Sequence, residues 1–190
     1  QYINTGYTPH KDTKVVCRLL DKGTDTHQAW GAMFGSRQSY DRTRSMYFWL
    51  RRDGSNVPSY GRAGDEYLLD KSTFPFGEIA TVTCQGTTCS WVNDSGTKRN
   101  GMTLTNCNAG QYDGFAPMLI FAVNSTSAEG GCFPTDCWSF KLYSFKIYEG
   151  TELKRDFVPC VETSSGRAGL WDLVERKFYP NNGSGSFKTP

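Results

Sequence analysis

The sequence predicts an all-β protein built as a two-sheet antiparallel β-sandwich. Glycine occurs 20 times and aromatic residues make up 14% of the chain, as expected for many short strands joined by turns. Short runs of β-prone residues recur between turn residues, and no stretch keeps helical periodicity over three turns. Any helix should therefore be a single short turn. The length of 190 residues favours one domain spanning 1–190, with a single hydrophobic core.

The expected strands follow one another at the spacing typical of a sandwich. Each is a run of Val, Ile, Thr, Phe, Tyr or Trp bounded by Gly, Pro, Asn, Asp or Ser. The runs are residues 14–20, 29–35, 46–51, 78–84, 89–92, 118–123, 140–148 and 153–158. Further strands should continue to the C-terminus.

Two of the connections read as hairpins. Gly86 and Thr87 separate residues 78–84 from 89–92, which brings Cys84 and Cys89 together near a hairpin end. The turn at 149–151 joins the next pair of runs in the same way.

Seven cysteines indicate an oxidising compartment, so we expect an extracellular or cell-surface location. Cys84 with Cys89 and Cys132 with Cys137 share one short spacing and are the predicted disulfides. The odd count leaves Cys17, Cys107 and Cys160 ambiguous. A zinc site made from the two close pairs is disfavoured, because the spacing is wrong for a zinc knuckle and only two histidines are present.

Charge and hydropathy exclude two classes of partner. The formal net charge is +2 and the basic residues are scattered, which argues against nucleic acid. The strongest local concentration of basic residues consists of Arg42, Arg44, Arg51 and Arg52. We interpret these arginines either as solvated residues at strand ends and in loops or as a local contact to an anion or acidic sugar. No run is long enough to insert into a membrane, and no signal peptide opens the chain. We expect a monomeric module taken from a larger multimodular protein.

Both ends of the chain carry motifs of a known family. The C-terminal third reads KLYSFKIY at 141–148, LKRDFVPC at 153–160, GLWDLV at 169–174 and KFY at 177–179; the N-terminal part reads QYINTGYTP at 1–9 and FGSR at 34–37. Together they resemble the laminin-G-like, concanavalin-A-like modules of large bacterial surface proteins. The resemblance implies a jelly roll of two curved sheets. It implies little about ligand, because this fold carries many functions.

The strand 46–51 offers the best candidate site. Alternation places Met46, Phe48 and Leu50 on one face, and Tyr47, Trp49 and Arg51 on the other. Aromatic rings stack on sugars and a guanidinium binds their hydroxyls or carboxylates, so the second set predicts a carbohydrate site. Arg37 and Tyr60 are placed beside it. The alternative is that a loop covers these rings, which would then fill a minor core.

Trp30, in phase with Phe34, is assigned to the main core, and Trp171 is interpreted as structural. Catalysis is not expected. No strand carries the alternating carboxylates of a retaining glycosidase, and Asp65 and Glu66 read as solvated loop residues. No cofactor is predicted, although loop aspartates leave a structural calcium ion open: Asp21, Asp25, Asp53, Asp113 and Asp136.

The leading hypothesis is a non-catalytic, lectin-like module that binds a polysaccharide or other glycan. The alternative is a structural or adhesive domain of a bacterial surface protein with a protein partner. An exposed aromatic row would favour the first, and a polar face with buried aromatics the second.

Overall fold

The computed structural model describes residues 1–25, 28–39, 42–68, 72–127 and 131–188. Within them the chain forms two eight-stranded sheets, so the predicted β-sandwich is confirmed. Helical structure in these residues is limited to two short 3₁₀ turns, Arg42–Arg44 and Ala109–Gln111, as the sequence predicts. None of the described helices has the length and apolar character of a membrane-spanning helix.

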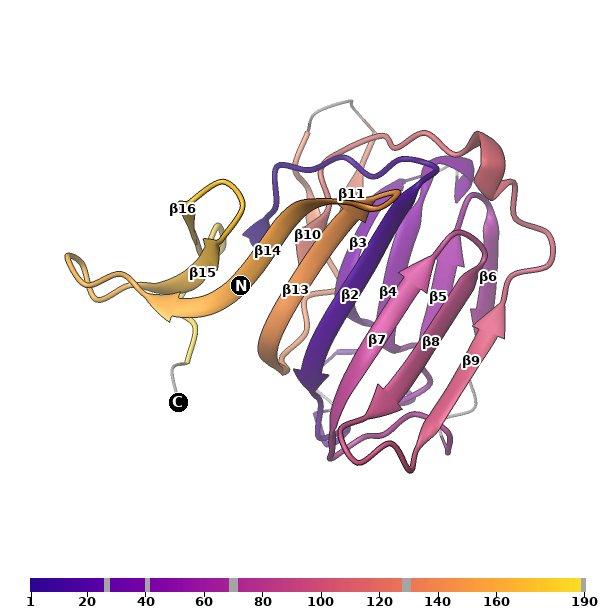
Figure 1. Cartoon of the computed structure of the whole chain (residues 1–190), viewed down its shortest axis with the longest axis horizontal. Coiled ribbons are helices and arrows are strands. Elements are labelled where there is room, and N and C mark those ends of the chain that lie inside the picture. Colours follow the sequence, from indigo (N-terminus) through magenta and orange to yellow (C-terminus); the bar gives the residue numbers. More distant parts are fainter. Residues whose placement is uncertain (26–27, 40–41, 69–71, 128–130, 189–190) are drawn as a thin grey trace.

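Sheet 1 lies at the back of the view in Figure 1. Its main path runs β1 (Ile3–Asn4), β10 (Leu119–Ile120), β3 (Gly31–Gln38), β4 (Met46–Arg51), β5 (Ser59–Arg62) and β6 (Asp65–Leu68). Two further strands, β11 (Val123–Thr126) and β12 (Pro134–Thr135), join it beside β3. The pairing of β11 with β3 is parallel, unlike the antiparallel arrangement predicted for the whole sandwich.

Sheet 2 lies in front of sheet 1 (Figure 1). Its order is β16 (Lys177–Pro180), β15 (Ala168–Asp172), β14 (Glu152–Val161), β13 (Lys141–Glu149), β2 (Thr13–Leu20), β7 (Ile79–Gln85), β8 (Thr88–Asn93) and β9 (Arg99–Thr103). The hairpins β7–β8 and β13–β14 are the two that the sequence predicts. The β14–β16 end curves away from the remaining strands.

The core fills the space between the sheets. Alternate residues of β2 are buried, as are Met46, Phe48 and Leu50 of β4, so the inward set predicted for β4 is confirmed. Phe34 of β3 and Phe145 of β13 meet edge to face across the sandwich, with ring centroids 5.6 Å apart. The two sheets are thus held by direct aromatic contact.

The run expected at 118–123 is broken into β10 and β11. Phe121 adopts a left-handed conformation with φ of 67°, which reverses the chain beside β3. Its N–H donates to the carbonyl of Met33 at 2.9 Å. This reversal explains why β10 is antiparallel to β3 while β11 is parallel to it.

Candidate ligand-binding face

The predicted site falls on the outer face of sheet 1, away from the main core. Tyr47 and Trp49 project there from β4, and their rings lie 4.3 Å apart. With Ala32 and Val123 they form a second, small hydrophobic cluster. Trp30 packs on this cluster with its ring centroid 4.7 Å from that of Trp49.

The two central rings are not exposed. Tyr47 retains 1% and Trp49 2% of its accessible surface, so the expectation of an exposed stacking surface is wrong for them. The structure matches the alternative, in which they fill a minor core. Trp30 is only half-buried and is the ring of this cluster that a ligand can reach.

Trp30 was expected in the main core. The register of β3 against β4 shifts between Gly31 and Ala32 and again before Phe34. These irregularities break the phase that links Trp30 to Phe34, and they place Trp30 on the outer cluster instead.

Two glycines allow the side chain of Tyr47 to lie against the outer face of sheet 1. A Cβ atom at Gly61 of β5 would lie 2.2 Å from Cζ of the Tyr47 ring, so the ring rests directly on the strand backbone. A Cβ atom at Gly35 of β3 would lie 2.7 Å from Cβ of Tyr47. Burial raises the pKa of the Tyr47 hydroxyl, and nearby Glu66 raises it further.

Arg37 lies where the sequence places it, beside Trp49. Its guanidinium carbon is 5.5 Å from the centre of the Trp49 ring, and Nε donates to Oγ of Ser125 at 3.1 Å. Nη2 lies 3.6 Å from Oδ2 of Asp136. Arg37 and Asp136 therefore border the aromatic cluster on the β3 side.

Arg51 does not join the cluster as predicted. It is buried at the end of the strand, where Nε donates to the carbonyl of Gln28 at 2.7 Å and Nη1 to Oδ1 of Asn56 at 2.8 Å. Arg51 therefore holds the neighbouring loops rather than facing a ligand.

Tyr60 is a clear correction. Its register partner in β4 is Phe48, so its ring points into the main core, where it is fully buried. Its hydroxyl donates to the carbonyl of Gly86 at 2.9 Å.

The β6 side of the face carries a charged group that sequence reasoning missed. Glu66 pairs with Gly61 in register and points outward, and its Oε1 accepts from Ser59 Oγ at 3.1 Å. Arg52 Nε lies 3.2 Å from Oε1, and Arg42 Nη1 lies 3.6 Å from Oε2. The signal was present in the Asp65–Glu66 pair, since one of two adjacent strand residues must face outward.

Trp49 leaves one polar atom unexplained. Its Nε1 is buried and has no hydrogen-bond partner among the residues that the structure describes. Buried donors are nearly always paired, so this donor is an exception, and its burial keeps it out of reach of a ligand on the surface.

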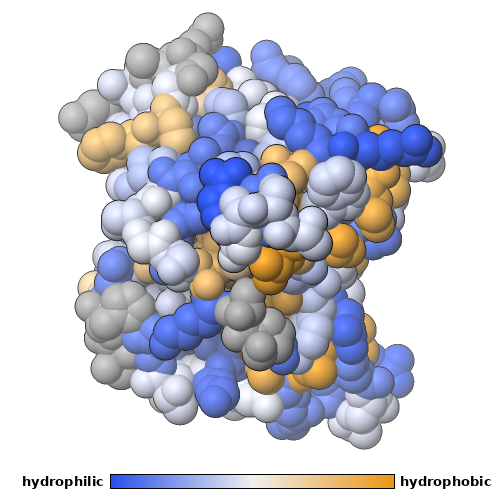
Figure 2. Space-filling view, turned by 90° about the vertical axis from the view of Figure 1, so that its left-hand side faces the viewer, coloured by the Kyte–Doolittle hydropathy of each residue, from blue (hydrophilic) through white to orange (hydrophobic). Residues whose placement is uncertain are grey.

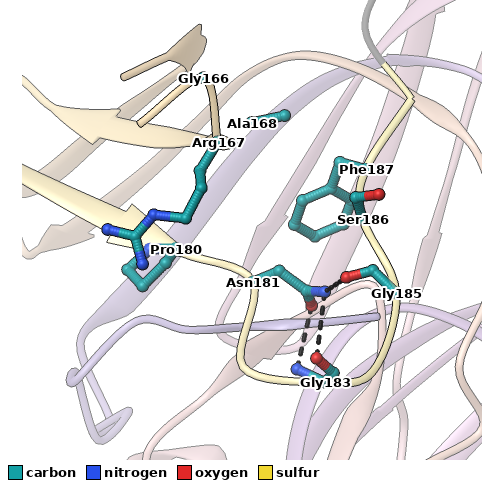
Figure 3. A pocket seen from close by; sticks show the side chains of 9 residues that line it. All are labelled: Gly166, Arg167, Ala168, Pro180, Asn181, Gly183, Gly185, Ser186 and Phe187. Atoms are coloured by element: carbon teal, nitrogen blue, oxygen red, sulfur yellow. Dashed lines mark hydrogen bonds between the residues drawn. The ribbon is translucent and has the colours of Figure 1, made fainter. Parts of the chain in front are cut away.

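The concave regions of the molecule lie elsewhere. A groove of about 1040 Å³ is lined by Phe121, Trp138, Phe140 and Phe187, and its buried carboxylate, Asp21, already accepts from Nε1 of Trp138 at 2.8 Å. The pocket in Figure 3 is smaller, about 360 Å³, and Asn181 uses its side chain within the surrounding loop, accepting from Gly183 N–H at 3.0 Å. The groove is also lined by polar side chains, among them Gln28, Ser139 and Lys141, but neither concave region contains a residue of the predicted site.

The predicted disulfides stay unconfirmed. Cys84 and Cys89 are register partners in the β7–β8 hairpin, but their sulfurs lie 3.1 Å apart, beyond the roughly 2.05 Å of a disulfide bond. Cys132 is exposed and Cys137 half-buried, and they are not bonded to each other either. In the described part of the chain, no three His, Cys, Asp or Glu side chains gather as metal ligands do.

Comparisons with known proteins show the fold alone. No protein-family model and no curated protein matches the chain. Its fold is similar to that of full-length tailspike protein 2 from Escherichia coli O157:H7 bacteriophage CAB120, with a TM-score of 0.53 and 11% identity over 77% of this chain and 21% of that one. It is also similar to the enzymatically active domain of bacteriophage CBA120 tailspike protein 2, with a TM-score of 0.51 and 10% identity over 77% of this chain and 23% of that one. The chain thus spans less than a quarter of the length of either structure.

Proposed function

We propose that the chain is a non-catalytic carbohydrate-binding module that uses the outer face of sheet 1. The proposal depends on one observation about this face. The buried rings of Tyr47 and Trp49 lie beneath the half-buried Trp30, and arginine–carboxylate contacts flank this cluster on two sides. A half-buried indole can stack on the apolar face of a sugar. Guanidinium and carboxylate groups supply the donors and acceptors that neighbouring hydroxyls need.

Each part of this face has its own role. Trp30 stacks on the sugar, while Arg37 and Arg52 donate to its oxygens and Glu66 accepts from a hydroxyl. Tyr47 and Trp49 hold the layer rigid from beneath rather than touching ligand. Rigid support lowers the ordering cost of binding.

The module acts without catalysis in this proposal. Glu66 and Asp136 each lie within 4 Å of an arginine, a pairing that suits hydrogen-bond acceptors. A hydrolase needs one carboxyl group to act as an acid on the leaving oxygen and a second to act as nucleophile or base. One tailspike neighbour is titled an enzymatically active domain, but the similarity to it extends only to the fold.

The resemblance to laminin-G-like modules of bacterial surface proteins supports an extracellular location for this module. We place the module outside the cell, as a monomeric unit attached to other domains that it holds close to glycans.

A glycan array followed by titration with the best ligand tests this function. Trp30→Ala and Glu66→Ala should each weaken binding at least tenfold, because each removes a direct contact, while Trp171→Ala on sheet 2 serves as the matched control. Circular dichroism must show that the variants fold. Binding to no glycan in a broad panel, or binding that survives both substitutions, would overturn the proposal.

A second candidate is an adhesive domain with a protein partner, and two observations favour it. The first is the burial of Tyr47 and Trp49, which leaves no exposed row of aromatic rings on β4. The second is an exposed apolar cluster on sheet 2. Trp171, Leu173 and Val174 are 37%, 52% and 44% exposed around the turn that follows β15. Figure 2, which views the side carrying β15 and β16, shows apolar side chains among polar ones. Exposed apolar clusters of this kind often mark protein interfaces.

Attachment of the labelled domain to intact bacterial cells separates the two candidates. Glycan binding should be abolished by periodate oxidation of the cells and by Trp30→Ala. An adhesive role predicts instead that protease treatment of the cells, or Leu173→Asp in the domain, removes attachment.

A further inference from the structure

The outer face of sheet 2 carries a second arrangement of cations and rings. No element crosses the front of β2, β7 and β13 in Figure 1, so among the described residues this sheet face is open. The charged and aromatic side chains on the outward side of β2 and β13 form what we call the lysine–tyrosine face: Lys14, Arg18, Lys141, Tyr143, Lys146 and Tyr148. Val16 and Leu20 of β2 also point outward and lie among them.

Cations and rings are interleaved on this face. Lys14 pairs in register with Tyr148, and its Nζ lies 4.1 Å from the ring centre. Further along the strands, Tyr143 lies between Arg18 at 4.9 Å and Lys141 at 5.2 Å. Cation–π contacts hold both rings in place while leaving them half-buried.

The face has an excess of positive charge. Arg18 is paired with Asp94, and Lys146 Nζ lies 3.0 Å from Oδ2 of Asp156. Lys14 and Lys141 have no carboxylate within 4.0 Å among the described residues, so two cations are left over. On the outer face of sheet 1, by contrast, Arg37, Arg42 and Arg52 all lie within 4 Å of a carboxylate.

Neutral hydroxyls continue the surface toward the sheet edge. Thr81 and Thr83 of β7 are the register neighbours of Arg18 and Val16, and Ser90 of β8 follows Thr83. The stretch from Lys14 to Leu20 covers roughly 20 Å along the strand at about 3.3 Å per residue. A ligand lying there would meet cations, rings and hydroxyls in turn.

We propose that the lysine–tyrosine face binds an acidic polysaccharide. Lys14 and Lys141 interact with carboxylate or sulfate groups, Tyr143 and Tyr148 contact the apolar faces of the sugar rings, and the threonine hydroxyls bond to sugar hydroxyls. The net excess of two charges suits a chain with separated anionic groups better than a nucleic acid, whose phosphates are closely spaced. This site is independent of the face proposed on sheet 1.

The test measures binding of four probes: alginate, dextran sulfate, neutral dextran and single-stranded oligothymidylate. We expect alginate or dextran sulfate to bind, with affinity falling as salt rises. The double variant Lys14→Ala with Lys141→Ala should lose at least tenfold in affinity for the acidic probe. Tyr148→Ala, which keeps the charge, should lose severalfold.

The matched control is Arg176→Ala with Lys177→Ala, which removes the same charge from exposed positions at the β15–β16 turn, outside this face. The proposal is overturned if the control loses as much affinity as the test variant, if the test variant binds like the unmodified protein, or if oligothymidylate binds more tightly than both acidic polysaccharides. A preference for alginate or for dextran sulfate identifies carboxylate or sulfate as the recognised group. Trp30-dependent glycan binding should be unchanged in the double variant.

Discussion

The ring of Tyr47 lies directly over Gly61, so close that a Cβ atom there would lie 2.2 Å from Cζ of the ring. Gly61→Ala must therefore displace Tyr47 from the sheet and disturb the cluster that supports Trp30. We expect a loss of about 1–3 kcal/mol in the free energy of unfolding, as for other overpacked sites. Urea denaturation measures this loss.

Gly110 provides the control for that substitution. A Cβ atom at Gly110 meets no other atom within 4 Å, so Gly110→Ala should change stability by less than about 0.5 kcal/mol. Equal effects at the two positions would contradict the packing of Tyr47 on Gly61.

Arg62 is a fully buried cation that binds backbone carbonyls. Its Nη2 donates to the carbonyls of His10 and Lys11 at 2.8 and 2.7 Å, and Nη1 donates to that of Thr13 at 3.1 Å. Arg62→Met removes the guanidinium donors from all three carbonyls, of which that of His10 keeps another donor, the N–H of Thr13 at 3.0 Å. We therefore expect a loss of roughly 3 kcal/mol in the free energy of unfolding. Thermal and urea denaturation test this.

Arg167→Met is the surface counterpart. Arg167 contacts Glu162 at 2.9 Å, but its side chain is 60% exposed, so its removal should cost less than about 1 kcal/mol. A similar loss for both arginines would show that the Arg62 bonds contribute little.

Strand β4 shows how much of this fold is predictable from sequence. Its bounds and its two faces follow from strict alternation of Met46, Phe48 and Leu50 with Tyr47 and Trp49. The burial of Tyr47 and Trp49 does not follow from alternation, because it depends on Trp30, which arrives through register shifts in β3. Long-range packing of this kind leaves no local pattern.

Phe121 and Glu66 show two further limits. The left-handed conformation of Phe121 splits a continuous apolar run without any Gly or Pro to signal a break. Glu66 belongs to the short strand β6, which has too few β-prone residues to be recognised, and its place opposite Gly61 comes from pairing with β5. The contribution of Glu66 to the candidate face is therefore determined by the pairing of β6 with β5, which the sequence does not reveal.

The β7–β8 hairpin makes a specific prediction about Cys84 and Cys89. The loop between these strands consists of Gly86, which has a positive φ, and Thr87. Gln85 and Thr88 face each other at the ends of the loop, and Cys84 and Cys89 are the next pair of residues directly opposite each other. Oxidation by a disulfide reagent such as oxidised glutathione should join their sulfurs and release two reduced thiols. Peptide mapping by mass spectrometry should recover the linked pair.

The bond should stabilise the fold by roughly 2 kcal/mol, the entropic effect expected for so short a loop. Cys84→Ala is the control, because it should abolish the linked peptide and make stability insensitive to the reagent. Mapping that finds Cys84 linked to Cys17 instead would contradict the hairpin pairing.

Asp21 predicts a characteristic dependence of stability on pH. Burial raises the pKa of its carboxyl group above the ordinary value of 3.8, although the N–H groups of Gly23 and Trp138 partly oppose this. The folded state then binds the proton more tightly than the unfolded state. This contribution to stability is complete below pH 3.8 and is lost as pH rises through the folded pKa. Asp21→Asn removes this titrating group. As pH rises from 3.8 through the folded pKa of Asp21, the free energy of unfolding of the variant should therefore rise relative to that of the unmodified protein.

Glu162 gives the opposite sign in the same experiment. Hydrogen bonds from Ser165 and Arg167 lower the pKa of its carboxyl group, so its contribution is present at higher pH and is lost as pH falls. The free energy of unfolding of Glu162→Gln should therefore fall relative to that of the unmodified protein as pH rises. That of Asp21→Asn should rise over the same change in pH. Urea denaturation of all three proteins at pH values on either side of 3.8 measures both differences. Parallel trends for the two variants would mean that the burial of Asp21 does not control its protonation, and that the bond from Trp138 keeps its carboxylate charged.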